Sequence, residues 1–168
     1  DEGDTLKVFK EPILPKDTNL SLRKRLVKKS SEILGDVLED WVHGEIEPTA
    51  QDDSEATYCW QKDISKENAE IDWENMEPEY IERMVRAFIP WPIAWTVWDG
   101  KRMKLFDVDL IECKSNRDAG ELFIDNDDLL FATKDKGKCI KVNKLQIAGK
   151  TKMKADEFVN GFRETLEN

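Results

Sequence analysis

Histidine, cysteine and long apolar runs are scarce in this sequence, and each scarcity argues against a class of protein. The 168 residues contain one histidine and three cysteines, Cys59, Cys113 and Cys139. An odd number of cysteines without CxxC spacing or a histidine cluster argues against both a zinc site and a disulfide framework. No uncharged stretch approaches the roughly 20 residues that cross a bilayer, and no signal-like segment opens the chain. We therefore expect a soluble protein of a reducing, cytoplasmic compartment, with no metal and no membrane partner.

Local motifs for enzyme chemistry are also missing. The sequence has no GxGxxG, GxxxxGK or HExxH motif, so neither a nucleotide-binding loop nor a metalloprotease helix is indicated. His43 precedes Gly44 at the expected end of a helix, where a histidine is more often a partner of the helix dipole than a catalyst. Cys59 has no adjacent base, so we do not expect a reactive thiol.

Charged residues, by contrast, are abundant and unevenly distributed. The net charge is −10, yet residues 134–154 contain eight lysines and one acid, a net charge of +7, which leaves −17 for the other 147 residues. A second basic cluster covers residues 23–29. Either run can be a solvated face with no further role. The uneven charge distribution is therefore compatible with a basic surface on an otherwise acidic protein.

The lysine-rich segment GKCIKVNKLQIAGKTKMK alternates lysines with apolar residues. This alternation predicts a strand that buries Ile140 and Val142 and presents Cys139, Lys141 and Asn143 on its other face. A basic sheet face of this kind can neutralise phosphates.

The first third of the chain predicts a strand, a helix and a linker. Residues 6–13 resemble a short strand, and a long helix is expected from caps at residues 17–19 to Gly44, with an apolar stripe that packs in a core. Residues 45–57 are acidic and nearly free of apolar anchors, so they predict a connection between domains.

The remaining sequence predicts a small antiparallel barrel between two helices. A helix is expected over residues 77–88, before Pro90 and Pro92. Strands are predicted on both sides of an Asp99-Gly100 turn and over residues 121–124, 129–133 and 138–147, with a last helix over residues 155–166. We expect the aromatic residues of the first strand region to pack in the core rather than stack on bases; these are Trp91, Trp95 and Trp98.

Six motifs, in order and with consistent spacing, make the whole chain resemble methionyl-tRNA formyltransferases. They are DEGDTL at 1–6, PILPKDT at 12–18, QDDSEATY at 51–58, SKENAEIDW at 65–73, RMVRAFIPWP at 83–92 and LQIAGKTKMKADEFVNG at 145–161. The resemblance implies transfer of a formyl group from 10-formyltetrahydrofolate to the amino group of methionyl initiator tRNA. One departure is Ile93, where the family often has glycine after the second proline, which weakens the prediction of a turn there.

The resemblance also implies an α+β organisation in three parts. Residues 1–44 would be a strand and helix left from a Rossmann-like formyltransferase domain, residues 45–66 the linker, and residues 67–168 an OB-like domain that binds tRNA. A chain that begins at this point of the family pattern is expected to be part of a longer enzyme, with its N-terminal catalytic domain missing. The full-length form is expected to be monomeric.

The catalytic chemistry of the family rests on an asparagine, a histidine and an aspartate. Asp1 corresponds to that aspartate, followed by Gly3 and Asp4 as the family pattern requires. In such a site the carboxylate orients the imidazole, and the other two groups stabilise the oxyanion on the formyl carbon. No NxH motif occurs in the sequence, so we expect these residues alone to be inactive and to bind no 10-formyltetrahydrofolate.

Two groups of lysines are the candidates for tRNA binding that the resemblance implies. Lys62 and Lys66 correspond to linker lysines, although this sequence carries about two extra residues around Cys59 to Lys62. Lys150, Lys152 and Lys154 lie in GKTKMK. Both groups would hold phosphates and not read bases.

Two other interpretations remain open at this stage. A related formyltransferase, acting on a nucleotide sugar, or a formyltetrahydrofolate hydrolase would share the DxGD pattern and much of the fold. A noncatalytic module could instead bind a protein through its acidic linker and Trp-rich helix.

Overall fold

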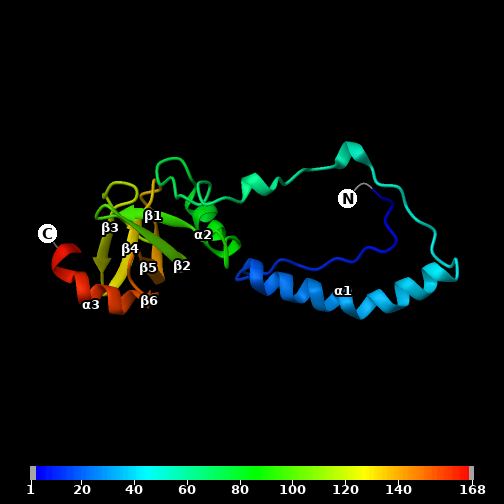
Figure 1. Cartoon of the computed structure of the whole chain (residues 1–168). Coiled ribbons are helices and arrows are strands. Elements are labelled where there is room, and N and C mark those ends of the chain that lie inside the picture. The colour runs from blue at the N-terminus through cyan, green and yellow to red at the C-terminus, as the bar shows by residue number, and fades with distance from the viewer. Residues whose placement is uncertain (1–2, 167–168) are drawn as a thin grey trace. The chain divides into compact units, whose positions relative to one another are not determined.

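The computed structural model describes residues 3–166. The chain divides into two units, Asp1–Trp60 and Gln61–Asn168, and Figure 1 shows the secondary structure of each. Among the described residues, the first unit contains one long α-helix, the short 3₁₀ helix η1 (Asp53–Glu55) and extended chain. The second contains all the strands and the other two α-helices. The division into three parts at residues 44 and 66 stays a prediction.

The long helix of the first unit, α1, spans Asn19–Val42, as the sequence predicts. It begins in a capping box, in which the side chains of Thr18 and Ser21 each accept a hydrogen bond from the other residue's backbone N–H. It ends at His43, whose Nδ1 lies 2.9 Å from the carbonyl oxygen of Glu39. His43 therefore contacts the last turn of the helix, in agreement with its predicted structural role.

The apolar stripe of α1 does not form a core within this unit, contrary to the sequence prediction. None of the helix residues is buried, and the side chains of Leu34 and Leu38 are more than half exposed. The period of the stripe predicts a helix face, but it carries no information on what covers that face. Among the residues described before Gln61, only Asp17 is buried.

The predicted strand over residues 6–13 is also absent. This segment is extended but joins no sheet, and its nearest ladder contact is an isolated antiparallel bridge between Thr5 and Thr49. A strand requires a neighbouring strand to take its backbone hydrogen bonds, and the described part of the first unit offers none. A Rossmann-like remnant is thus not seen here.

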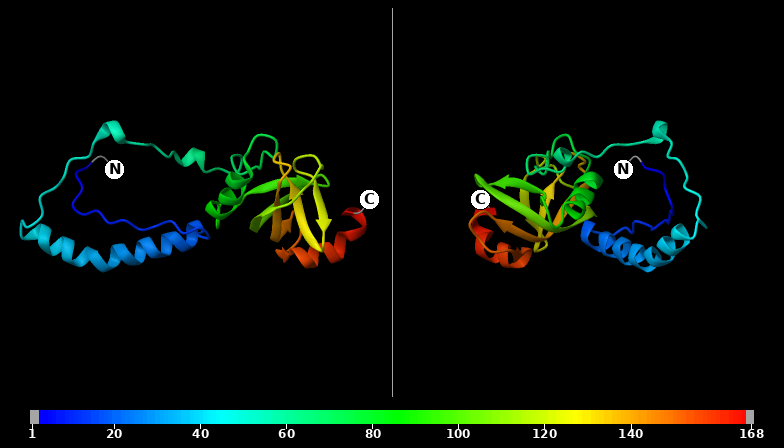
Figure 2. Two further views of the ribbon diagram at one scale, coloured as in Figure 1. Left: turned by 180° about the vertical axis from the view of Figure 1, so that it is seen from behind. Right: turned by 45° about the vertical axis from the view of Figure 1, so that its right-hand side comes forward.

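The second unit is built on one antiparallel sheet that curls into a half-barrel, consistent with the predicted OB-like domain (Figure 2). The sheet order is β1-β2-β5-β4-β3, with β6 beside β5. Its strands are β1 (Trp95–Trp98), β2 (Lys101–Glu112), β3 (Leu122–Asp125), β4 (Asp128–Ala132), β5 (Lys138–Ile147) and β6 (Met153–Lys154). The predicted hairpin is confirmed, because Asp99 and Gly100 both adopt positive φ between β1 and β2, as a type I′ turn requires.

Two helices complete the hydrophobic core of this unit. The helix α2 (Pro78–Ala87) packs on β2 and buries Ile81 and Val85, and α3 (Ala155–Leu166) packs along β3 to β6 and buries Phe158. Trp73 stacks on Phe131, with ring centroids 4.5 Å apart. The core and the two helices cover the inner face of the sheet.

The three tryptophans near β1 have different environments. Trp95 is buried, and Trp98 packs edge-on against Phe158, as predicted for core residues. The prediction is wrong for Trp91, which is 53% exposed, because its turn projects it away from the core. The turn persists without glycine, since Ile93 adopts a φ of 72° and its N–H donates to the Phe88 carbonyl.

The cysteines depart from the sequence prediction as well. Cys113 and Cys139 form a disulfide, and Cys59 is free and exposed. The two residues are 26 positions apart, but the antiparallel pairing of β2 with β5 brings their Cα atoms to 5.7 Å. Cys139 is fully buried in a small second cluster with Phe123 and Leu130, so it does not face solvent beside Lys141 as the alternation predicts.

Candidate functional site

The lysine-rich segment, residues 134–154, divides into two halves. In the neutralised half the lysines have acidic or carbonyl partners, and in the open half they form no ion pair among residues 3–166. Lys134, Lys138 and Lys141 form ion pairs with Glu77, Glu79 and Asp128 at 2.7, 2.5 and 2.7 Å. Lys136 donates to the backbone carbonyl of Arg117. The predicted basic face around Lys141 is therefore neutralised, because strand pairing brings in acids that lie far away in sequence.

The open half lies at the other end of β5 and in the turn to β6. The lysines there are exposed and form no ion pair among residues 3–166; they are Lys144, Lys150, Lys152 and Lys154. Lys144 is the register partner of Lys154 across the strand pair. Two like charges side by side repel each other, and an anion between them would relieve this repulsion.

The turn between β5 and β6 is held in place by backbone and side-chain contacts. Gly149 adopts a φ of 80°, and the N–H of Lys150 donates to the carbonyl of Ile147 at 3.0 Å. The side chain of Gln146 donates to the carbonyl of Lys150 at 2.9 Å. The ammonium of Lys152 lies 3.7 Å from the ring centroid of Phe106 on β2, a cation–π contact. The lysines of GKTKMK thus project from a fixed turn.

Two further cations on β2 belong to this surface. Lys104 is the register partner of Gln146, and side chains two apart on a strand share a face, so Arg102 and Lys104 lie on the same side. We call this surface the basic face; its cations are Arg102, Lys104, Lys144, Lys150, Lys152 and Lys154. Sequence reasoning missed Arg102, Lys104 and Lys144 as site residues, because only the pairing of β2 with β5 brings them together.

A buried tryptophan links Lys66 to the basic face. The indole Nε1 of Trp95 donates to the carbonyl of Lys66 at 2.7 Å, and the Arg102 guanidinium covers the Trp95 ring at 4.0 Å from its centroid. Lys66 itself is exposed. Trp95 therefore contacts both Lys66, from the first group of lysines, and Arg102 of the basic face.

The other predicted site residues are placed less directly. Lys62 is exposed in the short 3₁₀ helix η2 (Gln61–Asp63), and its carbonyl accepts from the side chain of Asn68. Asp1, predicted to correspond to the family's catalytic aspartate, lies outside the described residues.

Acidic neighbours moderate the charge of the basic face. Asp107 is exposed and is the register partner of Lys144. The pKa of Glu67 is lowered chiefly by a backbone N–H that its carboxylate accepts, then by the Ser65 hydroxyl and more weakly by Lys66 and Arg102. Both carboxylates reduce the net positive charge, but the cations still outnumber them.

Residues 3–166 contain no group of His, Cys, Asp and Glu that could hold a metal ion. None of the helices in that range has the length and apolar character of a membrane span.

Comparison with known proteins identifies the family. The sequence profile described as "Formyl transferase, C-terminal domain" matches residues 63–163, and this chain belongs to that family. Methionyl-tRNA formyltransferase of Halalkalibacterium halodurans is 33% identical over 162 residues, which cover 96% of this chain and 50% of the relative. That of Streptococcus gordonii is 33% identical over 167 residues, covering 99% and 51%. The chain spans about half the length of the curated relatives it matches.

Solved structures support the fold. A variant of HypX from Aquifex aeolicus superposes with a TM-score of 0.70 at 20% identity, over 99% of this chain and 30% of that one. The N-formyltransferase from Helicobacter canadensis, in complex with folinic acid and dTDP-3-aminofucose, gives a TM-score of 0.61 at 15% identity, over 84% and 50%. HypX has also been solved in complex with tetrahydrofolic acid.

Proposed function

We propose that this chain is the C-terminal portion of a methionyl-tRNA formyltransferase, in which the basic face holds the tRNA. The whole enzyme would transfer a formyl group from 10-formyltetrahydrofolate to the amino group of methionyl initiator tRNA. The family membership and the name shared by the matching relatives support the reaction. The observation that carries the role of this part is the cluster of exposed lysines at the β5–β6 turn without ion-pair partners among residues 3–166.

The chemistry of the basic face suits a phosphate backbone. Lysines act as flexible point charges that bind phosphates without reading sequence. Each phosphate contact releases counterions, so binding should weaken steeply with salt. Lys62 and Lys66 would extend the same surface into the linker, proposed as residues 45–66 between a catalytic-domain remnant (1–44) and the OB-like domain (67–168).

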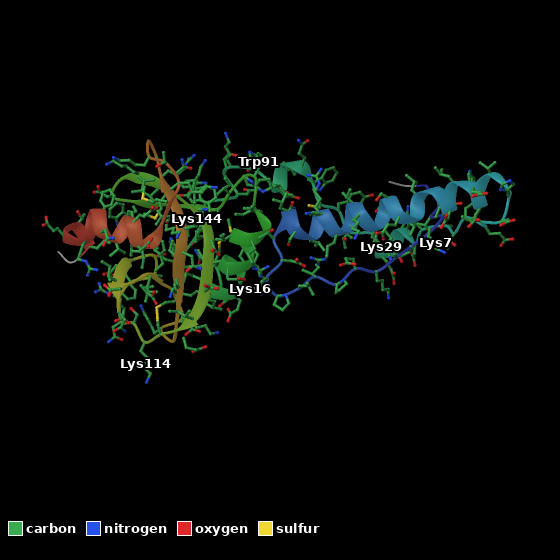
Figure 3. The ribbon with its side chains drawn as sticks, turned by 90° about the horizontal axis from the view of Figure 1, so that it is seen from below. Lys7, Lys16, Lys29, Trp91, Lys114 and Lys144 are labelled. Carbon is green, nitrogen blue, oxygen red and sulfur yellow. A yellow bond between two sulfur atoms is a disulfide. The ribbon has the colours of Figure 1, made fainter. Side chains whose placement is uncertain are left out.

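A charge-reversal experiment tests this role. Replacing Lys150, Lys152 and Lys154 with Glu should weaken initiator tRNA binding by at least tenfold at low salt. The matched control reverses three exposed lysines elsewhere, Lys7, Lys10 and Lys114, and so changes the net charge equally. Figure 3 shows Lys114 at the opposite end of the half-barrel from Lys144. Equal loss in both variants would mean that only net charge matters, which would contradict a defined binding surface.

We further propose that these 168 residues do not catalyse formyl transfer alone. The sequence lacks the NxH motif that would supply the asparagine and histidine beside Asp1. Formylated methionyl-tRNA produced by the purified chain, at a rate above a reaction without protein, would overturn this proposal.

A second candidate is a formyltransferase for nucleotide sugars. The N-formyltransferase superposition, with its bound dTDP-3-aminofucose, favours considering it. The two candidates differ in ligand size and salt response. A nucleotide sugar presents two phosphates, so its binding should change little with salt and with the lysine triple substitution, whereas tRNA binding should change strongly with both.

A further inference from the structure

A small cavity lies on the basic face, between the start of β2 and the end of β5. Its volume is about 230 Å³, and it is lined by Arg102, Lys104, Gln146 and the turn residues 147–149. Two cations and one side-chain amide thus converge on one hollow. Neither cation forms an ion pair with a carboxylate among the described residues.

Two of the donor side chains around this cavity, those of Arg102 and Gln146, are held by contacts. The Arg102 guanidinium carbon lies 4.0 Å from the centroid of the Trp95 ring, a cation–π contact that positions the guanidinium beside the cavity. The backbone carbonyl of Arg102 accepts from the N–H of Ala148 at 2.8 Å. Gln146 is fixed through the carbonyl of Lys150. A pre-arranged set of this kind loses little side-chain entropy when it binds an anion.

From this geometry we propose that the cavity is a binding site for a single phosphate group. The planar fork of Arg102 suits two phosphate oxygens, and the Lys104 ammonium supplies a second positive charge. The phosphate can come from an internal phosphodiester of RNA or from a phosphate monoester such as a 5′ end. That the phosphate belongs to tRNA rests on the proposed function; the existence of the pocket does not.

The position of the cavity explains how it would act together with the lysines. Arg102 stacks on the tryptophan that binds the Lys66 carbonyl, and Gln146 binds the carbonyl of Lys150. One phosphate in the cavity would therefore lie between the two lysine groups. It would fix the register of the backbone along the basic face, which flexible lysines alone cannot do.

Titration of the whole chain with inorganic phosphate tests the pocket directly by NMR. The side-chain amide of Gln146, the indole N–H of Trp95 and the amide of Lys150 should shift, and the double variant Arg102→Gln, Lys104→Gln should weaken binding at least tenfold. The control Lys114→Gln should leave the affinity unchanged. Absence of these shifts, or their persistence in the folded double variant, would overturn the proposal.

Competition distinguishes the source of the phosphate. Equal competition by RNA with a 5′-hydroxyl and RNA with a 5′-phosphate supports an internal phosphodiester, whereas competition by the 5′-phosphorylated RNA alone supports a terminal monoester. If neither RNA displaces inorganic phosphate, the assignment to tRNA fails while the pocket stands. Conversely, loss of the pocket with intact tRNA binding by the lysines would leave the proposed function in place.

Discussion

Gly120 allows a close approach of the chain to a core tryptophan. It adopts a φ of 84°, and a Cβ at this position would come within 2.6 Å of Cδ1 of Trp73. Both the backbone conformation and the space therefore require glycine. Gly100 shares only the first requirement, because a Cβ there would meet nothing within 4 Å. A comparison of substitutions at Gly120 and Gly100 therefore separates the free-energy cost of backbone strain from that of steric overlap.

We predict that Gly120→Ala destabilises the second unit more than Gly100→Ala does. An alanine in the left-handed region costs about 1–2 kcal/mol, which both variants incur. Overlap with Trp73 should add about 1–3 kcal/mol at Gly120 alone. Urea unfolding followed by tryptophan fluorescence measures both, and equal losses would contradict the close approach.

The ion pair between Glu79 on α2 and Lys138 on β5 should make stability depend on pH. The Lys138 ammonium, 2.5 Å away, is the main cause that lowers the pKa of Glu79 below its ordinary value. Because the folded pKa is below the unfolded one, the pair stabilises the fold above about pH 4.3 and loses this effect as the pH falls through both values.

Glu79→Gln tests this dependence. The variant should have a lower urea midpoint than the parent at pH 7, and the difference should shrink as the pH falls below about 4.3 and through the lowered folded-state pKa of Glu79. The exposed Glu74 provides the control variant, Glu74→Gln. A difference that stays constant from pH 7 to pH 3 would rule out a contribution from the ionised pair.

Individual residues show where sequence reasoning succeeds and where it stops. The Asp99-Gly100 turn is predictable because its conformation depends on two neighbouring residues. The ion pair of Lys141 is not, because Asp128 reaches it only through the register of β4 with β5. For the same reason Arg102 and Lys104, isolated charges in an ordinary strand pattern, give no local signal of a site.

At the scale of elements, the packing of helices and strands around β5 determines which of its lysines have an acidic partner. The helix α2 and the strand β4 supply acids to the first half of β5, whereas the partners of its second half are β2 and the short β6. Hydrophobic period predicts all three α-helices and the limits of β5 closely. The hydrophobic period cannot predict which lysines form ion pairs, since the order of the strands is not a local property of the sequence.

Pairing of β2 with β5 also predicts a measurable role for the disulfide. Cys113 and Cys139 are 26 positions apart, and closing a loop of this length typically stabilises a fold by about 3 kcal/mol. Reduction or Cys113→Ser should lower the urea midpoint accordingly, while Cys59→Ser should not. Without reductant, thiol titration of the unfolded chain should detect one free cysteine; three would contradict the disulfide.

At the scale of the whole molecule, the two units differ in how much they bury. The second unit has a continuous core, whereas none of the residues of α1 is buried. Most helical stability in proteins comes from packing and not from propensity. The apolar stripe of α1 was predictable as a pattern, but its exposure in this chain was not.

We expect hydrogen exchange to report this difference. Amides of α1 should exchange at least a hundredfold faster than those of β2 and β5, because opening α1 breaks no buried contacts within its unit. Mass spectrometry of the deuterated chain at two protein concentrations measures this. Slow exchange in α1 at both concentrations would contradict the expectation, and slowing only at the higher one would indicate self-association through the stripe.

The salt dependence of initiator tRNA affinity tests the central claim most directly. Each phosphate contact contributes a slope of about 0.7–0.9 to the fall of log affinity with log salt. If the basic face holds the tRNA backbone, reversing Lys150, Lys152 and Lys154 should reduce the slope of the parent chain by about 2–3, and reversing Lys7, Lys10 and Lys114 should leave it unchanged. An unchanged slope in the first variant, or an equal fall in both, would contradict the account.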